Sequence, residues 1–347
     1  MAFGSLLPSP SPHAPHTPFT SSFISYIVYM DIRQNLTHRE ETVLKTAPQA
    51  KATPYFAAGI AIFFWASTYA SVRYALQYYS PEALMLFRFL VAAIALLGYC
   101  GFKKIPPPKK KDLPLFLAAG FFGLFVYMWA FTTGAQTVPA GLSSFIISSA
   151  PVYTLIFAIV FLKEKATVQI WLGVLISFAG LAIISFSQAG TLQLSIGILL
   201  LLLAAVLLST YNIIQKRILQ TYTAIQSTAY CVGIATVCML IFLPTLAREL
   251  PYAPMSANLV IVWLGIGPAA GAYFLWAIAL SRAEKTIHVT SFSYLTPFLA
   301  SIIAFVWLGE QMAPLALLGG VIIITGMVLT NFKQIQRMLR EESTKPE

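Results

Sequence analysis

The sequence predicts an all-α membrane protein with ten transmembrane helices arranged as two inverted five-helix repeats. Two observations support the fold class. Hydrophobic residues make up 58% of the 347 residues and charged residues only 10%, whereas a soluble protein carries about 25% charged residues. Beyond residue 53 the apolar stretches are long enough to cross a bilayer, which takes about 20 residues. Most of the chain is therefore expected to lie against lipid.

Residues 1–53 differ in composition from the rest of the chain. They are rich in Pro, Ser, His and Thr and then in charged residues, which predicts a disordered cytoplasmic leader. The apolar patch at 23–30 is too short to span a bilayer. No Lys or Arg occurs in the first 29 residues, so the positively charged start of a secretory signal is missing. Met30 is an alternative translation start to Met1.

Ten apolar segments follow, separated by Pro, Gly and charged clusters such as KKIPPPKKKD at 103–112. The predicted spans are 54–76, 81–102, 113–134, 138–162, 167–187, 194–215, 224–246, 257–280, 286–308 and 312–332. They divide into a first repeat at 54–187 and a second at 194–332. Residues 333–347 are predicted to form a cytoplasmic C-terminal tail.

The distribution of Lys and Arg predicts the orientation. With the N-terminus inside, the cytoplasmic connections contain most of the Lys and Arg residues, and the external side has little beyond Arg73 and Arg248. Both termini of this multi-pass protein are therefore expected in the cytoplasm, with the helices in the inner (plasma) membrane. The net charge of +10 then reflects topology and contact with anionic lipid headgroups, and no nucleic-acid partner is expected.

The two halves of the chain repeat each other. An offset of 146 residues carries Pro151 to Pro297 and Glu164 to Glu310. Because each half has five helices, the second half must enter the membrane from the opposite side. Inverted repeats of this kind are typical of transporters that expose a central site to each side in turn. Further matches are Gly173 with Gly319, Gly180 with Gly326, Trp129 with Trp276, and Ser67-Thr68-Tyr69 with Ser209-Thr210-Tyr211.

Four stretches together resemble the EamA-type drug/metabolite transporters. They are FFWASTYASVRYAL (63–76), SPEALMLFRF (80–89), GPAAGAYFLWAIALSRAEKT (267–286) and PFLASIIAFVWLGE (297–310). The resemblance covers about 54–332 and implies two EamA repeats with a central cavity built mainly by helices 1, 3, 4, 6, 8 and 9. It also implies export or exchange of small metabolites, often amino acids. The first half departs from the pattern with LKE at 162–164, where LGE is usual.

Arg88 is a candidate for substrate binding or gating; it lies about 10 Å along helix 2 at 1.5 Å per residue. A cation inside a membrane is costly and is a functional candidate by default. The alternative is a structural role, in which Arg88 binds carbonyl groups or a helix end. Hydroxyl, amide and aromatic side chains on other helices suit a neutral or zwitterionic ligand. These further cavity candidates are Trp65, Ser67, Thr68, Tyr69, Tyr127, Trp129, Ser143, Ser144, Tyr211, Asn212, Tyr273, Trp276 and Tyr294.

Four residues are candidates for conformational roles. Pro151 and Pro297 each remove a helix hydrogen bond, so they form either static kinks or hinges. Glu164 and Glu310 lie at helix ends, where a carboxylate can cap the next helix. A role in gating is the alternative for both glutamates.

The sequence predicts no enzyme, because an intramembrane enzyme would need clustered His, Asp or Glu at depth. No metal-ligand spacing and no ATP-binding segment occur, so no cofactor is expected. The predicted function is secondary transport of small metabolites, amino acids first, with nucleosides, purines or neutral drugs as alternatives. A receptor or scaffold would not need the repeat. The expected partners are a small-molecule substrate and the bilayer, for a monomer or homodimer.

Overall fold

The computed structural model describes residues 53–138, 140–186, 195–308 and 314–342. These residues form helices joined by short connections, and no strand occurs among them. Eight helical segments in the described part are long and apolar enough to cross a membrane. The 23-residue α2 and the 19-residue α8 complete the ten predicted helices within those ranges. Residues 1–52 of the predicted leader and Glu310 lie outside the described residues, and Thr53 is the first residue of α2.

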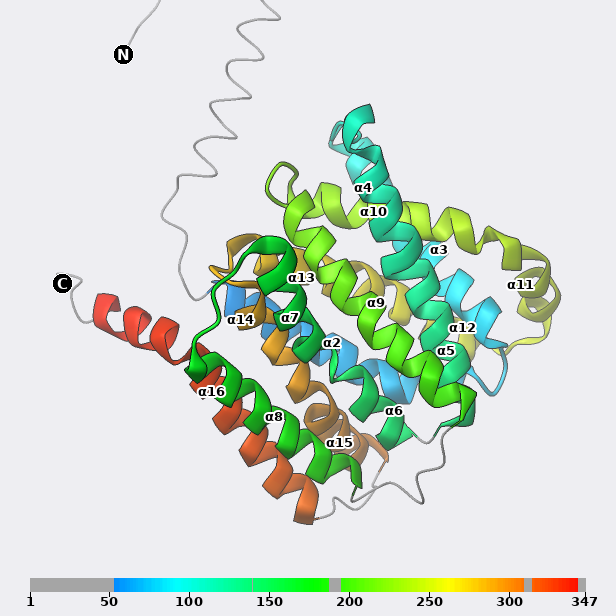
Figure 1. The fold of residues 1–347 in the computed structure, drawn as a ribbon. Helices are drawn as coiled ribbons and strands as arrows, with labels where there is room; N and C mark the ends of the chain where they lie inside the picture. The colour runs from blue at the N-terminus through cyan, green and yellow to red at the C-terminus, as the bar shows by residue number, and fades with distance from the viewer. Residues whose placement is uncertain (1–52, 139, 187–194, 309–313, 343–347) are drawn as a thin grey trace, which may run out of the picture. The chain divides into compact units, whose positions relative to one another are not determined.

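In the first repeat, helix 1 is α2 (Thr53–Ala75) and helix 2 is α3 (Pro81–Phe102). Helix 3 consists of η1 (Lys110–Asp112), α4 (Leu113–Gly120), η2 (Phe121–Val126) and α5 (Tyr127–Thr137). Helix 4 consists of α6 (Ala140–Ile147) and α7 (Ala150–Leu162), and helix 5 is α8 (Val168–Phe186). In the second repeat, helix 6 is α9 (Ile196–Ile218), and helix 7 consists of α10 (Ala224–Met239), η3 (Leu240–Phe242), α11 (Leu243–Glu249) and η4 (Leu250–Tyr252). Helix 8 consists of α12 (Met255–Leu264), η5 (Gly265–Gly271) and α13 (Ala272–Arg282). Helix 9 consists of α14 (Thr286–Thr290), η6 (Ser291–Tyr294) and α15 (Leu295–Leu308), and helix 10 is α16 (Pro314–Glu342). Figure 1 shows these elements in chain order.

Local sequence signals fix where several helices begin. Ser80 precedes α3, its hydroxyl accepts a hydrogen bond from the Ala83 amide at 3.3 Å, and Pro81 occupies the first turn. Both features favour a helix start, because proline lacks the amide that would be unpaired there. Thr223 and Gln226 form a capping box at the start of α10, which pairs two otherwise free donors.

One helix is longer than the sequence pattern predicted. Helix 10 was expected to end at residue 332, but α16 continues to Glu342. The extension has no Pro or Gly between residues 327 and 342, and Gln, Arg, Leu and Glu all favour helix. Most of the predicted C-terminal tail is therefore helical.

The contact between α8 and α16 shows how the two repeats are related. A Cβ added to Gly173 would lie 2.6 Å from the carbonyl oxygen of Gly326, and one added to Gly180 would lie 2.7 Å from that of Gly319. The earlier residue of one helix thus meets the later residue of the other, so the helices run antiparallel (Figure 1). The four glycines are the repeat-related pairs of the sequence, and they let the two backbones approach closely.

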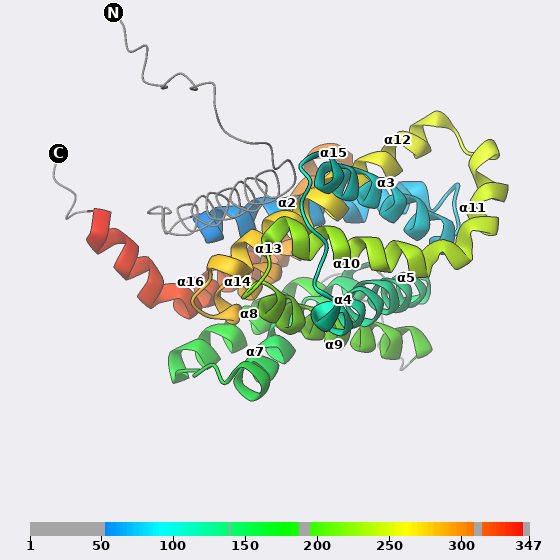
Figure 2. The same cartoon turned by 90° about the horizontal axis from the view of Figure 1, so that it is seen from above.

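The remaining helices repeat the same neighbours in the two halves. Helix 1 (α2) packs against the helix 8 element α13 and the helix 9 element α15. Correspondingly, helix 6 (α9) packs against the helix 3 element α5 and the helix 4 element α7. Helix 2 (α3) pairs with helix 7 (α10), its counterpart in the other half. The two halves therefore interdigitate, and the predicted pair of inverted five-helix repeats is confirmed; the arrangement can be followed in Figure 2.

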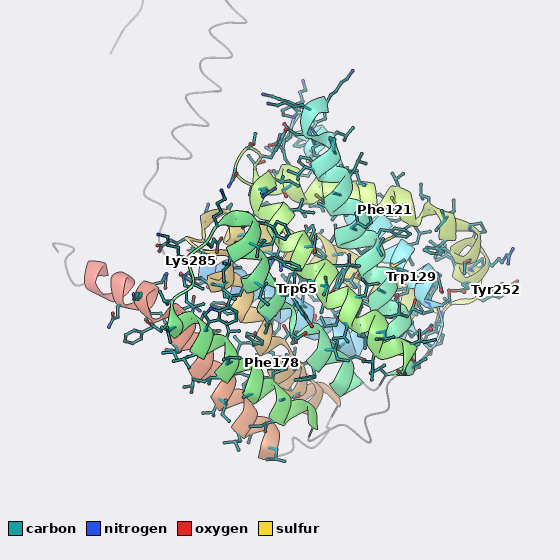
Figure 3. The ribbon with its side chains drawn as sticks, viewed as in Figure 1. Trp65, Phe121, Trp129, Phe178, Tyr252 and Lys285 are labelled. Carbon is teal, nitrogen blue, oxygen red and sulfur yellow. The ribbon has the colours of Figure 1, made fainter. Side chains whose placement is uncertain are left out.

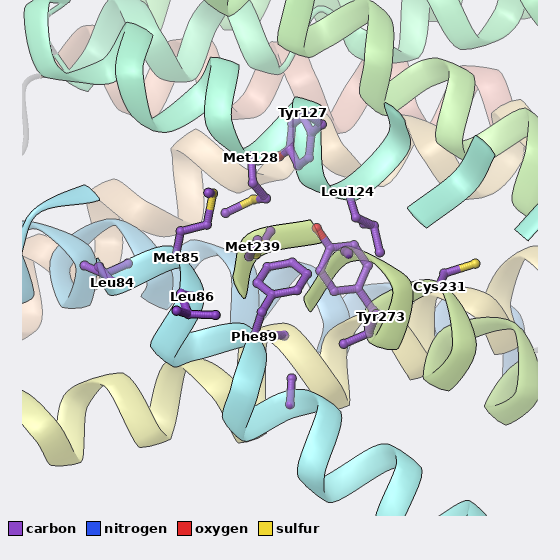
Figure 4. Packing of buried hydrophobic residues seen from close by; sticks show 14 of the residues in the cluster. Leu84, Met85, Leu86, Phe89, Leu124, Tyr127, Met128, Cys231, Met239 and Tyr273 are labelled. Atoms are coloured by element: carbon purple, nitrogen blue, oxygen red, sulfur yellow. The ribbon is translucent and has the colours of Figure 1, made fainter. Parts of the chain in front are cut away.

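The largest buried cluster lies where helices 2, 3, 6, 7 and 8 meet. It contains Phe89, Leu124, Tyr211 and Tyr273, each at most 3% exposed. Figure 4 shows part of it, with Phe89 of α3 beside Tyr273 and the Tyr273 hydroxyl directed toward the segment that carries Tyr127 and Met128. This cluster places several of the predicted site residues inside the protein.

Candidate functional site

Four aromatic rings from three helices meet in the interior. Trp65 of α2 lies 5.4 Å from Tyr273 and 5.0 Å from Trp276, measured between ring centroids. Tyr211 of α9 stands edge-on to Tyr273 at 6.0 Å. Separations of 4.5–7 Å are those that aromatic pairs prefer. Helices 1, 6 and 8 therefore build a continuous aromatic surface, and both repeats contribute to it.

Polar groups fix the orientation of these rings. The indole nitrogen of Trp276 donates to Oδ1 of Asn212 at 3.0 Å. The amide of Gln215 donates to the Tyr211 hydroxyl at 2.8 Å, one helical turn further along α9. Oε1 of Gln215 has no partner among the described residues. A buried acceptor without a partner costs about 1–3 kcal/mol, which a ligand donor would offset.

Arg88 lies next to this aromatic surface. Its side chain is 3% exposed, and it is within electrostatic reach of the Tyr273 and Tyr127 phenols. No described acid pairs with it, and its Nε has no hydrogen-bond partner among the described residues. Placing an arginine at the centre of a membrane helix costs about 2.5–3.5 kcal/mol on insertion scales. The charge is thus held in the interior without a protein counter-charge in the described part of the chain.

Helices 3 and 8 each change to π-helix beside the aromatic surface. The π-helical η2 precedes Tyr127, and the π-helical η5 precedes Tyr273. Such wide turns inside α-helices are frequent at functional sites. In η5 the carbonyl of Pro268 accepts a hydrogen bond from the Trp65 indole at 3.2 Å. The candidate cavity residues Tyr127 and Tyr273 therefore each follow a π-helical segment, one in each repeat.

Helices 4 and 9 are both interrupted. Pro151 is in the first turn of α7, after two turn residues that end α6. Pro297 is near the start of α15, after the 3₁₀ segment η6. Interrupted helices are found at the substrate sites of transporters built from inverted repeats. Buried hydroxyls without a partner among the described residues lie on these two helices: Thr154, Thr290 and Tyr294.

Several predicted site residues bond to nearby backbone carbonyls. The Ser67 and Thr68 hydroxyls both donate to the carbonyl of Phe64, at 2.7 and 3.2 Å. The Ser143 hydroxyl donates to the carbonyl of Val138 at 3.1 Å. The hydrogen of each of these three hydroxyls is therefore already used in a hydrogen bond to a backbone carbonyl. Tyr69 is half-buried near Tyr127, and the side chain of Ser144 lies outside the description.

Trp129 does not join the aromatic surface. Its side chain is 39% exposed. Figure 3 labels it together with two further exposed aromatic residues, Phe121 and Tyr252. The core-facing positions of α5 are taken by Tyr127, Ala130 and Gly134, which follow the helical repeat of 3.6 residues. Trp276 is therefore buried, whereas its repeat partner Trp129 is partly exposed.

The comparison with protein families matches nearly the whole described chain. The EamA-like transporter family matches residues 52–186 and again residues 195–332, which are the two structural repeats. The chain belongs to the EamA-like transporter family. It is therefore a membrane transporter, and the family boundaries coincide with the inverted repeats seen in the fold.

Relatives of this EamA transporter are found in bacteria. It is 36% identical over 275 residues to the "Uncharacterized transporter YdfC" of Bacillus subtilis, covering 78% of this chain and 89% of the relative. It is 33% identical to a "Probable terminal-alkyne amino-acid exporter" of Streptantibioticus cattleyicolor, covering 82% and 95%. A solved crystal structure with 18% identity superposes with a TM-score of 0.68 over 81% of this chain and 97% of that one, which supports the fold alone.

Hydrogen bonds tie together one end of the EamA helix bundle. We call this the Lys-rich end; it consists of the connections 103–112, 163–167, 219–223 and 283–285. The Tyr222 hydroxyl donates to the Asp112 carboxylate at 2.6 Å, and this bond raises the pKa of the phenol. The ammonium of Lys216 donates to the carbonyls of Leu280 and Ala283 at 2.6 and 2.7 Å. Cations are favourable at such helix C-termini.

Glu164 joins the two repeats at the Lys-rich end. Its carboxylate accepts hydrogen bonds from the Thr286 amide at 3.1 and 3.0 Å and from the Thr286 hydroxyl at 2.7 Å. It therefore caps the start of helix 9, where a carboxylate also opposes the positive end of the helix dipole. The sequence predicted a cap on the next helix along the chain. The capped helix instead belongs to the other repeat.

A left-handed turn directs Glu164 toward helix 9. Lys163 ends α7 with a φ of 55°, a region that glycine adopts without strain and that other L-residues rarely occupy. Lys163 is the position at which the family resemblance leads one to expect glycine. The LKE departure therefore leaves the turn unchanged and introduces a strained residue.

Two further polar positions of this EamA transporter escaped the sequence analysis. Gln215 is fully buried, and its spacing of four residues from Tyr211 would have indicated contact on one helix face. Thr228 of α10 donates to the carbonyl of Tyr273 at 3.3 Å and so anchors helix 7 to the aromatic surface. No signal in the sequence pointed to Thr228, because single threonines are common in membrane helices. Among the described residues, no group of His, Cys, Asp and Glu is arranged to hold a metal ion.

Proposed function

We propose that this EamA transporter exports or exchanges small metabolites, amino acids first, across the plasma membrane by alternating access. The observation that carries the proposal is the interior surface of Trp65, Tyr211, Tyr273 and Trp276, which both repeats build and which carries Arg88 and amide groups beside its rings. Rings with a few polar groups suit a small organic solute. The similarity to a relative named as a probable terminal-alkyne amino-acid exporter supports a related solute class.

The fold supports the proposed mechanism. Inverted repeats allow one half to exchange its conformation with the other, which moves access from one side of the membrane to the other around a fixed site. In this transporter the interrupted helices 4 and 9 lie on opposite halves and pack against helices 6 and 1. Their breaks beside Pro151 and Pro297 are the proposed hinges. Both termini are proposed to lie in the cytoplasm, on the side of the Lys-rich end.

The test is a counterflow assay with purified protein in liposomes. Vesicles preloaded with one unlabelled amino acid are diluted into a trace of the same labelled amino acid, and protein-free vesicles serve as the control. We expect accumulation above the control for at least one amino acid. Accumulation of nucleosides but of no amino acid would favour the alternative substrates, because the same rings can stack on a base.

Binding gives an independent reading of the same proposal. A ligand that binds only the folded protein raises the free energy of unfolding by about 2.7 kcal/mol at 100 times its dissociation constant. A thermal-stability screen of amino acids, nucleosides and amphiphilic drugs therefore ranks the solute classes before any flux is measured. Stabilisation by none of the three classes would contradict the proposal.

A further inference from the structure

The buried guanidinium of Arg88 has no acidic partner in the described part of the chain. Its electrostatic neighbours there are the phenols of Tyr273 and Tyr127, which are neutral groups. Its Nε hydrogen is left without an acceptor. A structural role in binding carbonyl groups, which the sequence left open, would require such an acceptor. Arginine presents a planar fork of donors that matches a carboxylate with two parallel hydrogen bonds.

Tyr273, a neighbour of Arg88, also belongs to the aromatic surface. Tyr273 is within electrostatic reach of Arg88 and lies 5.4 Å from the Trp65 ring. The guanidinium and the tryptophan pair are therefore separated by about one aromatic side chain. Trp65 and Trp276 lie next to each other, and the faces of aromatic rings attract an ammonium group within about 6 Å of the ring centre. A buried cation and a group of aromatic rings thus adjoin within one part of the interior.

We propose that Arg88 binds the carboxylate of the transported solute and that the rings of Trp65, Tyr273 and Trp276 receive its ammonium group. This inference rests on the proposed function and narrows the substrate class to zwitterionic amino acids. A single cation among neutral phenols matches one negative charge, whereas a phosphate dianion would need a second cation. Amines, amides and nucleosides lack the carboxylate and are expected to bind less tightly.

Ligand variation on the wild-type protein tests the carboxylate requirement. The amino acid that gives the strongest binding is compared with its amide and its decarboxylated amine, for example leucine with leucinamide and isoamylamine, and with inorganic phosphate. We expect the amino acid to bind about 10- to 100-fold more tightly than the amide, the range that hydrogen bonds to charged groups contribute. Equal binding of amino acid and amide, or competition by phosphate at equal concentration, would overturn the inference.

Variants of Arg88 test the assignment of the residue. Arg88→Gln should remove the preference for the amino acid over the amide, and Arg88→Lys should restore part of it because the charge remains without the planar fork. Arg248→Gln removes the same charge from an exposed position of α11 and should leave the preference unchanged. Retention of the full preference in Arg88→Gln would overturn the assignment to this residue.

The design separates two kinds of failure. If no amino acid binds the wild-type protein, the proposed function and this inference fail together. If amino acids bind but their amides bind equally well, only the inference about Arg88 fails. Size-exclusion chromatography of each variant in detergent shows whether it is folded. If Arg88→Gln does not fold, Arg88→Lys is compared with the wild type on the same ligands. An unchanged ratio of amino-acid affinity to amide affinity in Arg88→Lys would contradict the proposed contact of two parallel hydrogen bonds.

Discussion

At the scale of single residues, the chemistry of the interior depends on a few polar atoms. Asn212 and Gln215 each pair with an aromatic side chain across or along helices, while Gln215 Oε1 has no described partner. Such partly paired groups are costly in a membrane protein unless a ligand or water completes them. Their concentration around the aromatic surface is therefore the residue-level argument for a binding site.

Lys163 allows a residue-scale prediction about stability. Its φ of 55° costs an L-residue roughly 1–2 kcal/mol relative to glycine, and the greater freedom of glycine in the unfolded chain offsets part of this. Lys163→Gly should therefore raise the free energy of unfolding by up to about 1 kcal/mol. Thermal or chemical unfolding in detergent measures the change.

Lys165 provides the control for the Lys163 variant. It lies two residues further along and has no positive φ, so Lys165→Gly should give no gain in stability. A loss of stability in Lys163→Gly equal to that in Lys165→Gly would show that the left-handed turn is not strained.

At the scale of helices, close approach through glycine joins the two repeats. The contact of α8 with α16 leaves no room for a side chain at Gly173, Gly180 or Gly326. The Ser177 hydroxyl adds a bond to the carbonyl of Ile323 at 3.2 Å near the middle of the interface. Backbones this close gain dispersion contacts and interhelical hydrogen bonds, which drive helix association in lipid.

The glycine interface predicts that adding a side chain at one of its glycines lowers the stability of the protein. Gly173→Val would push its side chain into the Gly326 carbonyl and Thr330, so α8 and α16 should separate. Overpacking of this kind typically costs 1–3 kcal/mol, and we expect a loss of stability of at least about that size. The measurement is thermal unfolding followed by the loss of monodisperse protein.

Gly98 is the matched control for the interface. No atom lies within 4 Å of a Cβ built at this position of α3, so Gly98→Ala should be neutral or slightly stabilising through its better helix propensity. Similar losses for Gly173→Val and Gly98→Ala would argue against glycine packing as the contact between the repeats.

At the scale of the whole molecule, the two repeats differ in sequence at one contact of the Lys-rich end. Glu164 caps Thr286 at the Lys-rich end. The repeat offset of 146 residues carries Glu164 to Glu310 and Thr286 to Ala140, and alanine has no hydroxyl to offer. We infer that the Glu164 contact favours the conformation in which the Lys-rich end is tied together, which assigns a gating role to this residue.

Removing the Glu164 charge should open the Lys-rich end. Glu164→Gln keeps one carbonyl acceptor for Thr286 but loses the charge. Because a hydrogen bond to a charged group contributes a factor of about ten or more, this loss should shift the equilibrium between the closed and the open Lys-rich end by about that factor. The readout is maleimide labelling of Gln215→Cys in a variant with Cys100, Cys231 and Cys238 replaced by alanine. We expect impermeant maleimide added at the Lys-rich end to label this position about tenfold faster.

Glu249 is the control for the gating prediction. Its carboxylate accepts a hydrogen bond from the Ser80 amide at 2.8 Å, at the opposite end of α3 from the Lys-rich connections. Glu249→Gln should not speed labelling from the Lys-rich end. Unchanged labelling in Glu164→Gln would remove the gating role and leave Glu164 as a structural cap.

Much of the fold could be predicted from the sequence, because helix number depends on local properties. Apolar length sets the number of crossings, and prolines, glycines and caps set the ends; α3 has the predicted bounds Pro81–Phe102. The repeat of Pro151, Gly173 and Gly180 at a fixed offset, together with five helices per half, determined the inverted arrangement. Arg88 also stood out, since a lone cation in an apolar helix is conspicuous in any sequence.

Only the tertiary structure decided which side chains face one another. Trp129 and Trp276 match in sequence, but one is 39% and the other 2% exposed. In a soluble helix, polar residues mark the outer face; in a membrane helix the lipid-facing and core-facing sides are both apolar, so that mark is absent. Glu164 and Thr286 are 122 residues apart, and their contact follows from how the two repeats interlock. Helix count is local information, whereas helix rotation and partner choice depend on the packing of all ten helices.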